Sequence, residues 1–306
     1  MTIDRYPTAQ GFRRALELRL NGQARQLGLP LDRLRKEAAL VRLLARIVAT
    51  APQGGWALKG GLGMLARLGP RGRATADADA TWRGDAAGAQ ALLAQAADHD
   101  LGDHFEFLAT GPKALRGESP EGGLRFGVDV RLAGRLFERV NVDISVLPAD
   151  DRPLDAITLP NQCDFAGLPD VVVPTIRIEQ QLAEKLHAYT RNYGPQGNSR
   201  AKDLYDMLTI ATVLPIPDLH IVRQACQLVF TLRDTTWPLE LAPPPATWAG
   251  AWRGFVADYQ IGYADLEDAD HALRGFWAPV VAEQTNIQVQ DPAHWDATRW
   301  SWQAAR

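Results

Sequence analysis

Apolar residues recur every three or four positions in two stretches near the N-terminus. This spacing places them on one face of a helix, so helices are predicted over residues 11–27 and 32–49. In the second stretch, Arg33, Lys36 and Arg42 fall outside the apolar stripe. The stripe itself consists of Leu34, Ala38, Val41, Leu44, Ala45 and Val48.

After residue 49 the predicted elements become shorter. Residues 56–58 predict a short strand, Gly60-Gly61 a turn, residues 62–68 a helix and residues 75–82 a second strand. An alanine-rich segment predicts a helix over residues 85–98.

Three later runs alternate between apolar and polar residues and predict further strands over 105–110, 124–132 and 135–147. In the last run, the apolar residues share one strand face, opposite three polar residues: Asn141, Asp143 and Ser145. Strands and helices in this succession predict a mixed sheet with flanking helices.

From residue 175 onward the apolar spacing is helical. Helices are predicted over residues 178–192 and 200–213, with Ser199 as the N-cap of the second. Residues 148–174 are predicted as a long connection with short elements of its own, and the proline run 243–245 as a loop between helical hairpins. The sequence therefore predicts an α+β protein with an α/β domain over residues 1–174 and a helical domain over residues 175–306.

Composition adds several exclusions. The 306 residues are 46% hydrophobic and carry a net charge of −3, which argues against a general nucleic-acid coat protein but permits a local basic groove. The only cysteines, Cys163 and Cys226, are far apart, so neither a disulfide framework nor a zinc site is expected. The N-terminus lacks a signal-peptide pattern and no apolar run could span a bilayer, so a cytoplasmic protein without membrane contact is expected.

Two aspartates one residue apart, Asp77 and Asp79, stand on the predicted strand over residues 75–82. Alternate residues of a strand point to the same face, so the two carboxylates would lie side by side. Carboxylates this close repel each other unless a cation lies between them, and Mg²⁺ binds through one or two carboxylates together with substrate phosphates. The alternative without a function is a pair of solvated aspartates on an edge strand.

A Gly-Gly turn, a short helix and a strand with D-x-D resemble the DNA polymerase β-like nucleotidyltransferase superfamily. Within it, the chain resembles the AbiEii/AbiGii nucleotidyltransferase toxins of type IV toxin–antitoxin and phage abortive-infection systems, which include the MenT toxins. Three further segments carry this resemblance: VNVDISV at 140–146, RIEQQLAEKLHAYTRN at 177–192 and SRAKDLYDM at 199–207.

The resemblance implies roles for five residues. Asp77 and Asp79 would be catalytic acids that bind Mg²⁺ or Mn²⁺, and Asp143 would be a third metal ligand or the base. Lys185 in the E-K-L segment would contact the triphosphate of an NTP, and Asp203 would be the required first acid of the K-D-x-x-D segment. For Asp143 the alternative is a polar residue on a solvated strand face.

The resemblance also implies how the nucleotide binds. Gly60 and Gly61 would let the backbone approach the phosphates, and the following helix would offer free N–H groups. Most superfamily members have Gly-Ser here, so the Gly-Gly pair leaves backbone contacts only. Lys59, Thr75 and Arg200 complete the expected nucleotide-binding set, although the sequence leaves open whether Lys59 faces the phosphates or solvent and whether Thr75 only bonds to a loop.

The residues of the helical half have structural alternatives. A lysine beside an apolar stripe, such as Lys185, commonly extends its amine to solvent. Asp203 and Asp206 share one helix face and could pair with Arg191 or Arg200 to anchor one helix on another.

As a whole, the resemblance implies an enzyme that transfers NMP from NTP and releases pyrophosphate, with the helical domain completing the active-site cleft. The implied acceptor is the 3′ end of tRNA, whose blockage would stop translation, and the implied partner is a cognate antitoxin encoded nearby. Two alternatives stay open: nucleotidylation of a protein, and a non-catalytic binding protein of the same fold. A basic groove with exposed aromatic residues would favour RNA over protein. The four acids and bases Asp77, Asp79, Lys185 and Asp203 together argue against a non-catalytic protein.

Overall fold

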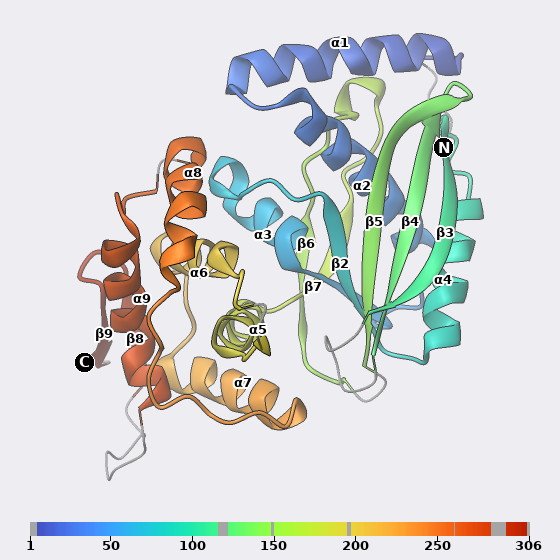
Figure 1. The fold of residues 1–306 in the computed structure, drawn as a ribbon. Coiled ribbons are helices and arrows are strands. Elements are labelled where there is room, and N and C mark those ends of the chain that lie inside the picture. The colour runs from blue at the N-terminus through green and yellow to red at the C-terminus, as the bar shows by residue number, and fades with distance from the viewer. Residues whose placement is uncertain are drawn as a thin grey trace. The chain divides into compact units, whose positions relative to one another are not determined.

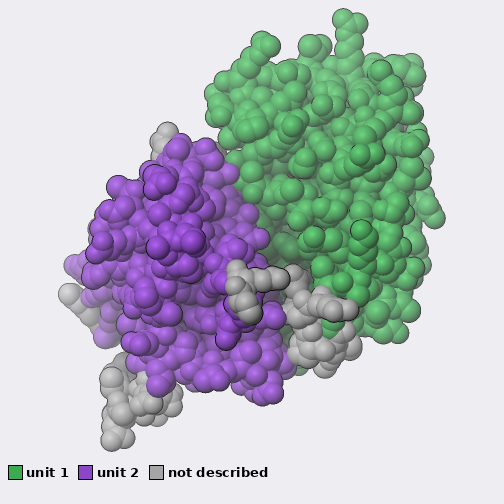
Figure 2. All heavy atoms as spheres, in the orientation of Figure 1, with its two compact units in different colours: residues 1–66, 74–176 green, residues 67–73, 177–306 purple. Residues whose placement is uncertain are grey.

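The computed structural model describes residues 5–115, 122–147, 150–194, 197–259, 261–282 and 292–304. The chain divides into two compact units (Figure 2). Unit 1 consists of Met1–Ala66 and Ala74–Ile176, and unit 2 of Arg67–Arg73 and Arg177–Arg306. The chain therefore passes from one unit to the other three times.

Unit 1 is built on a seven-stranded mixed sheet (Figure 1). Strand β1 pairs in parallel with β7 and antiparallel with β2, while β2 pairs in parallel with β5. The other neighbouring strands are antiparallel. In order across the sheet, the strands are β3 (Phe105–Leu115), β4 (Gly123–Leu132), β5 (Arg135–Val146), β2 (Asp77–Trp82), β1 (Trp56–Lys59), β7 (Val172–Ile176) and β6 (Leu154–Thr158).

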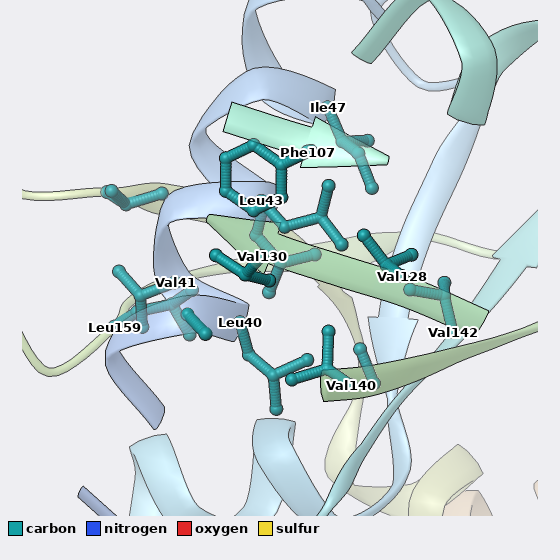
Figure 3. Packing of buried hydrophobic residues seen from close by; sticks show 14 of the residues in the cluster. Leu40, Val41, Leu43, Ile47, Phe107, Val128, Val130, Val140, Val142 and Leu159 are labelled. Atoms are coloured by element: carbon teal, nitrogen blue, oxygen red, sulfur yellow. The ribbon is translucent and has the colours of Figure 1, made fainter. Parts of the chain in front are cut away.

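Helix α2 packs its apolar residues against one face of this sheet. Leu40, Leu43 and Ile47 belong to the same buried cluster as Val128 and Val140 of the strands (Figure 3). Because side chains alternate along a strand, the polar residues between these valines project from the opposite face. The helices that begin in unit 1 are α1 (Ala9–Leu27), α2 (Leu31–Thr50), α3 (Gly60–Leu68) and α4 (Ala86–Asp98).

Helix α2 is enclosed more completely than its apolar stripe predicts. Arg42 and Arg46 are buried and both donate to the carboxylate of Asp103, at 2.7 and 2.6 Å. Burial alone would raise the pKa of Asp103, but the two arginines outweigh it and hold that pKa below its usual value. Arg33, also buried, pairs with Glu37 at 2.8 Å. Part of the polar side of this helix thus consists of matched buried charges.

Unit 2 is helical and closes on a two-stranded hairpin near the C-terminus. Three indole N–H groups, those of Trp295, Trp300 and Trp302, donate to backbone carbonyls of α6 and α9. These bonds anchor the hairpin to the helices. The elements are α5 (Ile178–Thr190), α6 (Ala201–Val213), α7 (Leu219–Leu232), α8 (Ala249–Tyr259), α9 (Leu266–Val281), β8 (Ala293–Asp296) and β9 (Ser301–Ala304).

The prediction of an α+β protein with a mixed, helix-flanked sheet and a helical C-terminal half is confirmed. The short elements expected in the connection over residues 148–174 are β6 and most of β7, which join the sheet. The structure differs in two details: the Gly-Gly pair begins α3 instead of forming a separate turn, and the C-terminal half ends in a hairpin. In the parts of the chain that the structure describes, no helix is long and apolar enough to cross a membrane.

Candidate active site

A row of four charged side chains crosses four strands of unit 1. The strand registers pair Arg125 with Asp143, Asp143 with Asp79, and Asp79 with Lys59. Residues opposite one another in a sheet share a face, so all four project from the face opposite to α2. Asp77, two residues before Asp79, lies on the same face. The structure thus brings together the three predicted acids and Lys59, with Arg125 as an unpredicted fifth member.

Asp143 is buried and fully paired. Its side chain lies against Arg125, whose Nε and Nη2 donate to Oδ1 and Oδ2 at 2.7 and 2.5 Å. Asp143 is only 4% exposed, so the alternative of a solvated strand face is wrong. The same Nη2 lies 3.9 Å from Oδ2 of Asp77. One guanidinium therefore faces two of the three acids.

Asp77 is more accessible than Asp143, with 34% of its side chain exposed. Its Oδ1 accepts a hydrogen bond from Asn141 Nδ2 at 2.9 Å, and its backbone carbonyl accepts one from Thr75 Oγ1 at 3.0 Å. Thr75 therefore makes the local hydrogen bond that the sequence left as its ordinary alternative. These bonds fix the start of β2 and the orientation of its first carboxylate.

Gly60 lies directly against the carboxylate of Asp79. Its φ is +65°, and a Cβ added to it would lie 2.0 Å from Asp79 Oδ2. Only glycine accommodates both the left-handed backbone and this close approach. The first glycine of the pair is therefore required by the acid beside it, and buried Gly61 continues the first turn of α3.

Lys59 is buried, which decides the orientation that the sequence left open. It is the last residue of β1, and its Nζ donates to Ser145 Oγ at 2.9 Å. Because it pairs in register with Asp79, its positive charge stands next to the acidic pair. The row therefore reads, from β4 to β1, as positive, negative, negative, positive.

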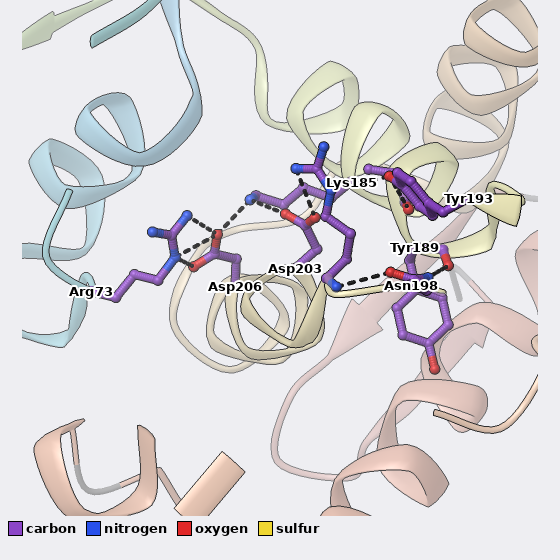
Figure 4. A network of polar contacts seen from close by, with 9 residues as sticks. Arg73, Lys185, Tyr189, Tyr193, Asn198, Asp203 and Asp206 are labelled. Carbon is purple, nitrogen blue, oxygen red and sulfur yellow. Dashed lines mark hydrogen bonds and ion pairs between the residues drawn. The ribbon is translucent and has the colours of Figure 1, made fainter. Parts of the chain in front are cut away.

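Unit 2 holds a second charged cluster, in which one lysine lies between two aspartates (Figure 4). Lys185 Nζ donates to Asp203 Oδ1 at 3.1 Å and to Asp206 Oδ2 at 2.5 Å. Arg73 also forms an ion pair with Asp206, with Nε 3.0 Å from Oδ1. Lys185 is 5% exposed and Asp206 1% exposed, so the alternative of a solvent-directed lysine is wrong.

The charges of this cluster stabilise one another. Burial alone would lower the pKa of Lys185, but Asp206 and Asp203 outweigh it and raise that pKa. Burial would likewise raise the pKa of Asp206, but Lys185 and Arg73 hold it below its usual value. Both groups are therefore charged at neutral pH, and removal of either would leave a buried charge without its main partner.

Two predictions about this cluster need correction. The N-cap of α6 is Arg200, with no side-chain capping bond, instead of Ser199. The predicted alternative of an ion pair with Arg200 holds for Asp203, at 3.8 Å, whereas Asp206 pairs with Arg73. The partner of Asp206 lies 133 positions away in the sequence, so no local pattern could reveal it.

Two arginines flank an aromatic ring just after α5. The guanidinium carbons of Arg191 and Arg200 lie 5.4 and 5.7 Å from the ring centroid of Tyr193. Arg200 Nε also donates to the Tyr193 hydroxyl at 3.1 Å. These cation–π contacts gather two positive charges around one aromatic ring.

Comparison with known proteins identifies the family. A family model described as the nucleotidyl transferase AbiEii toxin of type IV toxin–antitoxin systems matches residues 42–275. The chain belongs to the AbiEii family. The resemblance predicted from the sequence is therefore confirmed, and the protein is a nucleotidyltransferase. No curated protein matches the chain.

The fold of this AbiEii protein is shared by a solved structure, that of MenT4. MenT4, a nucleotidyltransferase toxin from Mycobacterium tuberculosis H37Rv, is 21% identical and matches with a TM-score of 0.52, over 84% of this chain and 93% of that chain. JHP933 from Helicobacter pylori is 14% identical, with a TM-score of 0.39 over 78% of this chain and 87% of that chain.

Nucleotidyltransferases of the AbiEii kind use an NTP and a divalent metal ion, for which carboxylates are the expected protein ligands. Among the described residues, no three histidine, cysteine, aspartate or glutamate side chains form a candidate metal centre. Asp77 and Asp79 nevertheless project side by side on one face. Mg²⁺ needs only one or two carboxylates when substrate phosphates and water supply its other ligands. This pair therefore fits a nucleotide-bound ion.

Replacement of Gly60 by alanine tests the close approach in this AbiEii protein. The new Cβ would displace the Asp79 carboxylate, and an alanine at this φ would cost about 1–2 kcal/mol of stability. We expect nucleotidyl transfer to fall about a hundredfold, as for a catalytic group misplaced by an ångström. Steady-state assays and thermal melts would measure both effects. Gly22→Ala, where a Cβ meets no atom within 4 Å, should keep full activity; equal losses in both variants would contradict the assignment.

The stability of this AbiEii protein should fall in mild acid because of His187. It is buried, neither ring nitrogen has a hydrogen-bond partner among the described residues, and the ring packs on Phe230 at 5.2 Å. Burial, with Arg233 and Arg191, lowers its pKa from 6.5 to about 4. Between these values the unfolded chain binds more protons, so the free energy of unfolding decreases as pH falls from 6.5 towards 4.

Denaturant melts across that pH range would measure the slope. His187→Leu loses no hydrogen bond and should flatten the profile in this interval. An unchanged slope in the leucine variant would assign the acid sensitivity to other groups.

Proposed function

We propose that this protein is a Mg²⁺-dependent toxin that transfers NMP from an NTP to RNA in the cytoplasm, most directly to the 3′ end of tRNA. A nucleotide blocking that end would prevent aminoacylation and stop translation. A cognate antitoxin, the expected partner of a type IV toxin, would prevent this damage in the producing cell. The observation that carries the proposal is the placement of Asp77 and Asp79 on one sheet face, with Gly60 directly against Asp79.

The acidic pair would hold the nucleotide through a shared ion. An ion bound there would neutralise charge on the triphosphate and orient it for in-line attack. Gly60 supports this arrangement because its missing side chain leaves room for the Asp79 carboxylate. The N–H groups at the start of α3, at Gly61 and beyond, offer hydrogen bonds and a positive helix end to the phosphates.

The transfer itself makes one bond and breaks one. A terminal ribose hydroxyl of the RNA attacks the α-phosphorus of the NTP, the bond from that phosphorus to the bridging oxygen breaks, and pyrophosphate leaves with the electron pair. The hydroxyl proton passes to water. Little covalent chemistry falls to the protein, so positioning and charge stabilisation account for the rate.

Lys185 and its aspartates are the proposed contribution of unit 2. Asp203 and Asp206 hold the ammonium in one position, so the lysine would lose little conformational entropy when a nucleotide binds. We assign Lys185 to the phosphates of the nucleotide, and Asp203 to the orientation of that lysine. We assign Arg200, whose Nη1 lies 3.8 Å from Asp203 Oδ2, as a further nucleotide-binding cation.

The group formed by Arg191, Tyr193 and Arg200 supports RNA over protein as the acceptor. The two guanidiniums would attract RNA phosphates, and planar guanidiniums held in this way can themselves stack on unpaired nucleobases. A protein acceptor would need a site for an extended peptide, and nothing in this arginine–tyrosine group favours one.

Incubation of the purified protein with MgCl₂, total tRNA and each α-labelled NTP in turn tests the proposal. A parallel reaction uses tRNA whose terminal ribose has been opened by periodate, which destroys the 3′ acceptor. Asp79→Asn serves as the inactive variant. Label on intact tRNA, absent with oxidised tRNA and with the variant, is the expected result.

Other outcomes would change the proposal in defined ways. Label on oxidised tRNA would move the acceptor away from the 3′ end. Label on a protein band in a cell extract, with none on tRNA, would retain nucleotidyl transfer and replace the acceptor. Equal transfer by wild type and Asp79→Asn would remove the acidic pair from the chemistry.

A further inference from the structure

Arg125 stands where a cation shared by two acids would stand. Its guanidinium donates to both oxygens of Asp143, and the same Nη2 lies 3.9 Å from Asp77 Oδ2. Asp143 and Asp77 come from the adjacent parallel strands β5 and β2. A divalent ion bridging these carboxylates would need the space that the guanidinium fills.

The balance of charge in the row also disfavours an additional ion. Asp143 and Asp79 are flanked by Arg125 on one side and Lys59 on the other, so the row is neutral as it stands. Asp77, which Arg125 approaches only to 3.9 Å, adds one negative charge to this balance, and both Asp77 and Asp79 are partly exposed, unlike Asp143. The negative charge left on this face can therefore bind one ion at the Asp77–Asp79 pair. At Asp143 little negative charge is left to bind a second ion.

Arg125 and Asp143 differ in exposure. The Arg125 side chain is 42% exposed, whereas its partner Asp143 is enclosed. An arginine fork fixes a carboxylate in one orientation more rigidly than a lysine does, because it bonds both oxygens at once. The buried acid thus serves to hold the arginine in place.

We propose that Arg125 replaces a second metal ion, so that the site binds one divalent ion with the nucleotide, at Asp77 and Asp79. Asp143 is then a positioning residue for Arg125 and no metal ligand. The inference rests on the proposed function, since it concerns the ion that would accompany the NTP. Its consequence is that the attacking hydroxyl meets a fixed guanidinium instead of a metal ion on this side of the site.

Metal counting on the full-length protein tests this without any turnover. Equilibrium dialysis against Mn²⁺, with a saturating α,β-methylene NTP analogue that cannot be cleaved, gives the ions bound per bound nucleotide. Electron paramagnetic resonance of the free ion provides a second count. We expect one Mn²⁺ per nucleotide in the wild type and two in Arg125→Gln, because that change frees both oxygens of Asp143.

Two further variants complete the design. The double variant Arg125→Gln/Asp143→Asn removes the freed ligand and should return the count to one. Arg139→Gln is the matched control, because Arg139 also joins β5 to β4 through an aspartate, Asp129, at 3.0 Å on the same sheet. Its count should stay at one. Thermal melts would show that each variant is folded.

Two Mn²⁺ per nucleotide in the wild type would overturn the inference whatever the variants do. A count of one in both wild type and folded Arg125→Gln would also overturn it, because the arginine would then not be what excludes the second ion. Neither result would affect label transfer to tRNA, which tests the proposed function separately. Absence of that transfer, with a count changing from one to two, would contradict the proposed function alone.

Discussion

Asp79→Asn should lower nucleotidyl transfer about a thousandfold while the protein stays folded. The change keeps the shape of the side chain but removes half of the charge that the acidic pair offers to the ion. Loss of metal-assisted charge stabilisation is worth several kcal/mol in the transition state, and each 1.36 kcal/mol is a factor of ten. Its neighbour Gly60 has no side chain to clash with the new amide.

Steady-state assays with saturating Mg²⁺ and a thermal melt of each protein would measure this. Asp129→Asn is a suitable control, because Asp129 is an exposed ion-pair partner of Arg139 on the same sheet. That variant should retain wild-type activity. An Asp79→Asn protein within tenfold of the wild type would show that Asp77 alone suffices, and the ion-binding role of the pair would have to be abandoned.

Lys185→Met should remove activity and also destabilise the protein. The methionine fills the space of the lysine stem but leaves Asp203 and Asp206 buried without the ammonium between them. Removal of one partner from a buried ion pair costs about 3–5 kcal/mol of folding free energy. Loss of a positioned positive charge at the phosphates should lower transfer by at least about a hundredfold.

A double variant separates the two effects. Lys185→Met/Asp203→Asn removes one negative charge together with the positive one, while Asp206 keeps its bonds to Arg73. We expect it to regain much of the stability measured in denaturant melts and none of the activity. Restored transfer in the double variant would mean that Lys185 serves the fold and not the nucleotide.

The parts of the site that sequence could reveal are those set by local spacing. A strand repeats every two residues, so Asp77 and Asp79 are bound to share a face once β2 is recognised. The helices of the N-terminal region follow in the same way from their apolar spacing. These features depend on neighbours a few positions apart, and no tertiary information is needed for them.

The partners of the site residues depend on strand register and long-range packing. Arg125 meets Asp143 only because β4 and β5 pair with one particular offset, and Lys59 meets Asp79 only through the register of β1 and β2. A shift of one residue would turn Arg125 to the other face of the sheet. The two-residue turn Ala133-Gly134 sets the register where β4 meets β5, but the register shift between Val130 and Arg131 changes it before Arg125, and no local pattern specifies that shift.

Short strands are also difficult to predict from sequence, because they too depend on long-range packing. Strand β7 spans five residues and contains Pro174, which interrupts any strand pattern. Strands β8 and β9 have four residues each, and their tryptophans make bonds to helices that are distant in the sequence. Elements this short take their structure from what they pack against.

The segment Arg67–Arg73 limits how this protein can be divided or recombined. It leaves unit 1 after Ala66, belongs to unit 2, and returns at Ala74, three residues before Asp77. Its Arg71 carbonyl accepts a bond from the Tyr205 hydroxyl at 2.7 Å, and its Arg73 pairs with Asp206. A single crossover after Ile176 would therefore give a chimera whose two halves disagree at this segment. In a chimera with a related protein, unit 2 would have to be exchanged together with its segment Arg67–Arg73. The two units are therefore not interchangeable modules.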